Sequence, residues 1–121
     1  DPYMLERHAK IGNAVRAAVK EAGLELYQET GFSNTVTVFN VPEGTTDTAI
    51  LTAMKEKCNI MLAGSFGAFA GKVIRIGHMG ENAYLEKVGA VMDGLDLVFK
   101  DLGITLKCSL KEAYDRKMSE Q

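Results

Sequence analysis

Apolar residues recur at every third or fourth position over residues 3–22, and this pattern constrains the fold more than any other feature of the sequence. The repeating positions are Met4, His8, Ile11, Val15, Ala18, Val19 and Ala22. The spacing is that of an α-helix with one apolar face. Pro2 suits the first turn, and Gly23 suits the position just after the last turn. Since an apolar helix face must be covered by a second layer, the sequence predicts a layered fold.

The remaining segments supply the other layer. Short strands are predicted over Leu24–Tyr27, Thr35–Val41, Asn59–Leu62 and Lys72–Gly77, from their apolar and β-branched residues. Helices are predicted over residues 47–57, 85–102 and 110–119, with Thr46 or Asp47 and Ser109 as capping residues. The predicted order is α-β-β-α-β-β-α-α. We therefore expect the α+β class, with helices packed on one face of a small, mostly antiparallel sheet.

Composition limits the possible functions. The chain has 121 residues, enough for a single domain, and a net charge of −2 from 14 basic and 16 acidic side chains. Without a basic surplus, nucleic acid is not expected as a partner. The longest uncharged stretch, Cys58–Gly71, is too short to span a bilayer, and no signal peptide opens the chain. The sequence begins at Asp1 rather than Met, so we expect either a product cut from a longer polypeptide or a segment of one.

The two cysteines indicate a reducing compartment. Cys58 and Cys108 lie far apart, and neither is close in sequence to a cluster of metal-ligating residues. We expect free thiols, no metal site and a cytoplasmic location.

Arg75 is the candidate binding residue. Within residues 73–77, alternation places Ile74 and Ile76 on one face of a strand and Arg75 on the other, beside glycine-rich loops. A planar guanidinium holds a carboxylate in one orientation through two parallel hydrogen bonds. The spacing alone leaves open a solvated arginine, or one that pairs with an acid of the same chain.

Other candidate residues have weaker patterns. Gly64, Gly67 and Gly71 could cradle an anion, but their spacing matches neither the dinucleotide-binding motif nor the phosphate-binding P-loop. A tight connection between strands explains them equally well. His78 and Tyr84 could exchange protons, although no partner residue for either is visible in the sequence. The residues alone therefore predict no catalytic group.

Several segments together resemble the C-terminal part of class V pyridoxal-phosphate aminotransferases, the group that includes the alanine–glyoxylate and serine–pyruvate aminotransferases. The signature is the run from Gly71 to Gly80, GKVIRIGHMG. Residues 6–8 and 23–27 resemble the family's helix and first small-domain strand, and residues 33–37 with 41–44 resemble its S-x-T-V-T…P-x-G stretch. Residues 85–103 resemble the last helix of the family's small domain. The resemblance covers about residues 5–103 and leaves 104–121 as a helical extension at the C-terminus.

The resemblance implies a division of labour between two domains. The family's large domain holds pyridoxal phosphate (PLP) on a lysine, and its small domain closes over the substrate. Residues 1–121 correspond to the small domain alone, and Arg75 matches the arginine that grips the substrate α-carboxylate. PLP is then expected in the full-length parent, a homodimeric transaminase acting on a small amino acid, with glyoxylate or pyruvate as acceptor.

Several cofactor-binding residues of the family have no counterpart in this sequence. The family's cofactor lysine, its aspartate and its phosphate cup have no counterpart here, so we expect no cofactor bound by this chain alone and no catalysis by it. The expected partners are the missing large PLP-binding domain and a small amino or keto acid. Two alternatives stay open at this point: a stand-alone α+β module that binds amino acids or regulates, and a folded fragment without activity.

Overall fold

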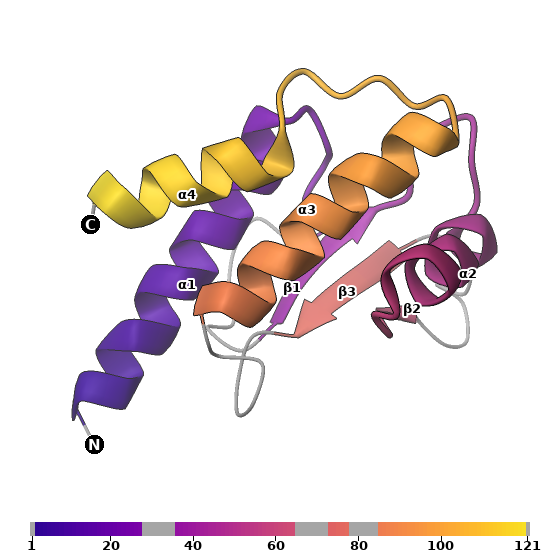
Figure 1. The fold of residues 1–121 in the computed structure, drawn as a ribbon. Coiled ribbons are helices and arrows are strands. Elements are labelled where there is room, and N and C mark those ends of the chain that lie inside the picture. The colour runs from indigo at the N-terminus through magenta and orange to yellow at the C-terminus, as the bar shows by residue number, and fades with distance from the viewer. Residues whose placement is uncertain (1, 28–35, 65–72, 78–84, 121) are drawn as a thin grey trace.

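A computed structural model describes residues 2–27, 36–64, 73–77 and 85–120 of the chain. Its helices are α1 (Pro2–Glu21), α2 (Asp47–Cys58), α3 (Leu85–Asp101) and α4 (Leu110–Glu120). Its strands are β1 (Val36–Asn40), β2 (Ala63–Gly64) and β3 (Val73–Gly77). Figure 1 shows α3 running across the small sheet, with α1 and α2 to either side of it. The predicted α+β class is confirmed.

The sheet is antiparallel throughout, and its last strand in sequence is its central one. The strand order is β1-β3-β2, so β3 pairs on both sides. Arg75 in the middle of β3 lies opposite Val38 of β1 and opposite Ala63 of β2. Directly opposed residues share a face in an antiparallel pair, so this register fixes which residues accompany Arg75.

The hydrophobic core lies between one face of the sheet and the helices. Phe39, Ile74 and Ile76 are fully buried on that face and cluster with side chains from all four helices. The Phe39 and Phe99 rings lie 6.4 Å apart between centroids and are tilted by 56°, which joins β1 to α3. The burial on α1 follows the predicted periodicity from Ile11 to Ala22, where the structure describes the side chains.

Two strand predictions are wrong in detail. Leu24–Tyr27 forms only an isolated bridge, Leu26 to Phe39, instead of a full strand. Asn59–Leu62 forms no strand because Asn59 ends α2 in the left-handed conformation, at φ 56°. The Ile60 amide then donates to the Met54 carbonyl at 3.1 Å, and Met61 is 80% exposed. Pairing with β3 begins only at Ala63, so the short buried strand predicted at this point does not exist.

Candidate functional site

Arg75 lies on the face of the sheet opposite the core. Alternation along β3 puts Ile74 and Ile76 into the core, whereas Val73 and Arg75 point the other way. Val73 is only 3% exposed, yet it does not belong to the core cluster. The predicted placement of Arg75 away from the isoleucine face is therefore confirmed.

The side chain of Arg75 is partly shielded from solvent. It is half-buried, and its Nε atom is covered from solvent. Val38, which lies opposite Arg75 on β1, is also half-buried. A guanidinium beside apolar side chains interacts with an anion more strongly than one surrounded by water, because the local dielectric is lower. This position suits the binding of a carboxylate.

The segment Leu24–Tyr27 widens the same face. The Tyr27 amide donates to the Val38 carbonyl at 3.0 Å, and the Asn40 amide donates to the Glu25 carbonyl at 2.8 Å. Tyr27 is therefore opposite Val38 and Glu25 is opposite Asn40, on the side of the sheet that carries Arg75. We call this side the outer face; its described side chains are Glu25, Tyr27, Val38, Asn40, Val73 and Arg75.

Other predicted site residues lie elsewhere or outside the described residues. Gly64 belongs to β2, at the edge of the sheet. Gly67, Gly71, His78 and Tyr84 lie outside the described residues, so their predicted roles stay predictions. Cys58 and Cys108 are half-buried free thiols, as predicted.

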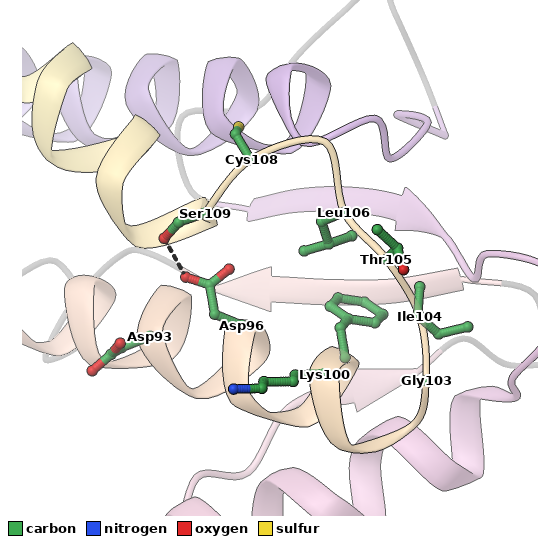
Figure 2. A pocket seen from close by; sticks show the side chains of 10 residues that line it. Asp93, Asp96, Lys100, Gly103, Ile104, Thr105, Leu106, Cys108 and Ser109 are labelled. Atoms are coloured by element: carbon green, nitrogen blue, oxygen red, sulfur yellow. Dashed lines mark hydrogen bonds between the residues drawn. The ribbon is translucent and has the colours of Figure 1, made fainter.

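A pocket of about 550 Å³ lies on the other side of the molecule's core, where α3, the loop 103–109 and α4 meet (Figure 2). The Asp96 carboxylate at this pocket accepts hydrogen bonds from the Ser109 hydroxyl at 2.6 Å, the Leu110 amide at 2.7 Å and the Lys111 amide at 3.1 Å. The Ser109 hydroxyl in turn accepts from the Glu112 amide at 3.2 Å. The Asp96 carboxylate thus caps α4 and connects it to α3. We therefore assign this pocket a structural role and not a ligand-binding one.

Asp96 was not among the residues predicted from the sequence. The predicted cap at Ser109 is present, but its acidic partner comes from another helix, at a separation that no local capping pattern covers. Nothing in the sequence alone distinguishes Asp96 from the exposed Asp93 one turn earlier.

The described residues do not fit PLP. That cofactor requires an enclosed lysine amine for its imine and a set of donors for its phosphate. The lysines in ion pairs lie at the surface: Lys57 pairs with Asp101, Lys111 with Asp115 at 2.5 Å, and Lys117 with Glu120 at 3.4 Å. Lys100 at the pocket of Figure 2 is exposed. Across residues 2–27, 36–64, 73–77 and 85–120, no group of three acidic, histidine or cysteine side chains could hold a metal.

The helices within those ranges include none that is both long and apolar enough to cross a membrane.

Known proteins resemble this chain along most of its length. An uncharacterised aminotransferase of Methanocaldococcus jannaschii is 38% identical over 104 residues, which is 85% of this chain and 27% of that protein. The serine–glyoxylate aminotransferase of Arabidopsis thaliana is 35% identical over 102 residues, or 83% of this chain and 25% of that enzyme. The chain belongs to the aminotransferase family. The resemblance predicted from its sequence is confirmed, although no protein-family model matches it.

Solved aminotransferase structures share the fold. The ureidoglycine–glyoxylate aminotransferase of Bacillus subtilis matches 96% of this chain with a TM-score of 0.88 and 29% identity. The pyridoxamine–pyruvate aminotransferase of Mesorhizobium loti matches 95% with a TM-score of 0.86 and 27% identity. This aminotransferase chain spans about a quarter of the length of the curated relatives and 30% of each of these two structures.

Proposed function

We propose that residues 1–121 form the small, substrate-closing domain of a class V PLP-dependent aminotransferase, and that Arg75 binds the α-carboxylate of the substrate. One observation carries the proposal: the central strand of an aminotransferase-like sheet presents a half-buried guanidinium on the face opposite its helices. Because this face is opposite the helices, a second domain could contact it without disturbing the core. Residues 104–121 form a C-terminal helical extension that we assign to the same domain, because Leu110 and Tyr114 of α4 are buried in its core.

The physical role of Arg75 is to fix the orientation of the substrate. A guanidinium has parallel donors that match the two oxygens of a carboxylate, so the bound acid cannot rotate freely. Each charge-assisted hydrogen bond contributes about 1.5–3 kcal/mol, and more where water is excluded. β3 is paired on both sides, and this rigid backbone keeps the guanidinium in place.

The remaining groups of the active site are assigned to the rest of the protein. We assign the cofactor and its lysine to a large domain outside this chain, so we expect no transamination by the chain alone; the lack of a fitting PLP site among the described residues supports this assignment. The acceptors in the relatives' names, glyoxylate and pyruvate, support a small keto acid as acceptor. A small amino acid is the corresponding donor. We further propose a homodimeric parent in the cytoplasm, where thiols such as Cys58 and Cys108 stay reduced.

The test uses the full-length aminotransferase that carries this segment. Arg75→Lys and Arg75→Ala should each raise KM for the amino donor, by at least tenfold for Arg75→Ala, because the parallel hydrogen bonds are lost. Lysine keeps the positive charge but lacks the parallel donors of a guanidinium, so Arg75→Lys should raise KM less than Arg75→Ala does. The matched control is Arg116→Ala, which removes an exposed guanidinium that pairs with Glu21.

The outcomes separate binding from folding. The cofactor's absorption spectrum and the thermal midpoint should stay close to those of the wild type in each variant. A KM unchanged by both Arg75 substitutions would remove Arg75 from the site. A thermal shift of the 121-residue chain with free amino acids, in the absence of PLP, would instead favour a stand-alone binding module.

A further inference from the structure

The outer face carries an acidic side chain as well as the arginine. Among the sheet residues and the Leu24–Tyr27 segment that the structure describes, the charged residues are Glu25 and Arg75. Glu25 is on the outer face because its carbonyl accepts from the Asn40 amide at 2.8 Å, which sets these two residues opposite each other. One cation and one anion therefore share a face whose other described strand side chains include Val38 and Val73.

A side-chain contact fixes the position of the Glu25 carboxylate. The Asn40 side-chain amide donates to Glu25 Oε1 at 2.9 Å, so the carboxylate is held beside β1. Asn40 is opposite Val73, two residues before Arg75 on β3. The negative charge is thus on the Arg75 side of the segment Leu24–Tyr27. It is also exposed, which leaves it accessible to a ligand on this face.

Sheet geometry sets the scale of the separation. Strands lie about 4.8 Å apart and rise about 3.4 Å per residue, so two strands and two residues place the Glu25 and Arg75 Cα atoms roughly 12 Å apart. A monocarboxylic substrate has its only carboxylate on Arg75, so the rest of the molecule brings no second negative charge toward Glu25. If a four-carbon dicarboxylate bound to Arg75 extends along the outer face toward β1, its second carboxylate lies nearer to Glu25 than the first and comes within about a Debye length of it, about 8 Å. Like charges at such distances repel each other.

We propose that Glu25 is a specificity-determining residue that disfavours dicarboxylic substrates, so that this aminotransferase acts on monocarboxylic amino and keto acids. The inference rests on the proposed function of Arg75 as the carboxylate-binding residue. Glu25 acts by charge repulsion across the outer face, and Asn40 acts as a positioning residue that holds the Glu25 carboxylate.

The test compares two inhibitors of equal shape on the full-length enzyme. Succinate and succinamate differ in that an amide replaces one carboxylate, so the ratio of their inhibition constants isolates the second charge. Glu25→Gln removes the charge and keeps an oxygen that can accept from Asn40, which preserves the fold. We expect the inhibition constant of succinate to fall about three- to tenfold in this variant while that of succinamate stays constant. The control is Glu56→Gln, an exposed acid on α2, in the helical layer.

Ionic strength supplies a second readout that a merely structural role would not produce. In the wild type, the preference for succinamate over succinate should shrink as salt rises from 20 mM to 500 mM, because screening weakens repulsion between exposed charges. In Glu25→Gln this salt dependence should be largely lost. The proposal would be overturned if Glu25→Gln left the ratio of the succinate and succinamate inhibition constants at its wild-type value. It would also be overturned if both inhibition constants changed by the same factor.

The two proposals fail in different ways. If the Arg75 variants weaken both inhibitors while Glu25→Gln leaves the ratio unchanged, then Arg75 binds the carboxylate and Glu25 has no part in specificity. If the Arg75 variants affect neither inhibitor, the carboxylate site lies elsewhere and both proposals are wrong.

Discussion

The Asp96 carboxylate on α3 accepts a hydrogen bond of 2.6 Å from the Ser109 hydroxyl at the start of α4. The same carboxylate accepts from the Leu110 and Lys111 amides, so an acid on one helix satisfies the first donors of the next. Leu110 and Tyr114 on α4 are fully buried. Asp96 thereby fixes the helix that delivers these two large side chains to the core.

Removal of this cap should destabilise the chain. Asp96→Ala leaves two amides and a hydroxyl without their acceptor, and we expect the free energy of unfolding to fall by about 2–3 kcal/mol. Asp96→Asn keeps one acceptor oxygen and should cost less. The control is Asp93→Ala, an exposed acid on the same helix, which should change stability by less than about 0.5 kcal/mol. Urea unfolding measures all three, and equal losses for Asp96→Ala and Asp93→Ala would contradict the assignment.

Two glycines on α3 should respond to substitution in opposite directions. A Cβ at Gly89 would meet Lys111 Cε, in a flexible surface side chain, at 3.2 Å. Gly89→Ala should therefore stabilise the chain by about 0.5–1 kcal/mol, because alanine favours a helix interior.

A Cβ at Gly94 would meet Cys58 Sγ at 3.1 Å and Met54 Cε at 3.2 Å, where α2 packs against α3. Gly94→Val should force the two helices apart and cost about 1–3 kcal/mol. Thermal and urea unfolding of both variants give the comparison. A stabilised Gly94→Val would show that the contact between α2 and α3 adjusts freely.

The thiol of Cys108 should titrate above the ordinary range. Burial raises the pKa of this thiol above its ordinary value, and the carboxylate of Glu21 adds to the effect, against an opposing contribution from Arg116. The folded chain therefore keeps its proton at a pH where the unfolded chain has lost it, so stability should decline as pH rises through about 9. In a Cys58→Ser variant, the rate of iodoacetamide alkylation against pH should have its midpoint above that of the same variant in urea. A midpoint at or below the unfolded value would refute this prediction.

The 121-residue chain should bind PLP without specificity. The paired lysines that the structure describes lie at the surface, so an imine formed there gains no enclosing site. After incubation with PLP and reduction by borohydride, mass spectrometry should find scattered, substoichiometric labels. One lysine labelled to completion would show a cofactor site within this chain.

Local patterns in the sequence predicted all four helices that the structure describes. The apolar period of residues 3–22 predicted α1, and Thr46 caps α2 as expected, since its hydroxyl accepts from the Ala49 amide at 3.1 Å. Alternation in residues 73–77 correctly separated Arg75 from Ile74 and Ile76. These features depend on neighbours within a few positions, which a single sequence displays.

Features that depend on distant contacts were harder to predict. Ile60 and Leu62 suggested a strand, but the left-handed turn at Asn59 and the register with β3 move the pairing to Ala63. The pairing of Leu24–Tyr27 with β1, which brings Glu25 to the face of Arg75, depends on a register that no local pattern specifies. The same is true of Asp96, whose partners follow it after a turn.

The packing of α1 against α4, visible at one side of Figure 1, links the first and last helices of this segment. Arg116 of α4 pairs with Glu21 of α1, and the Lys107 amide donates to the Ala22 carbonyl at 2.9 Å. On a ribosome, the part of α1 that α4 covers stays uncovered until almost the whole segment has emerged, whereas β1, which α1 also contacts, emerges much earlier. Contacts so remote in sequence slow folding, and the apolar side chains of α1 that α4 covers stay exposed to solvent in the meantime.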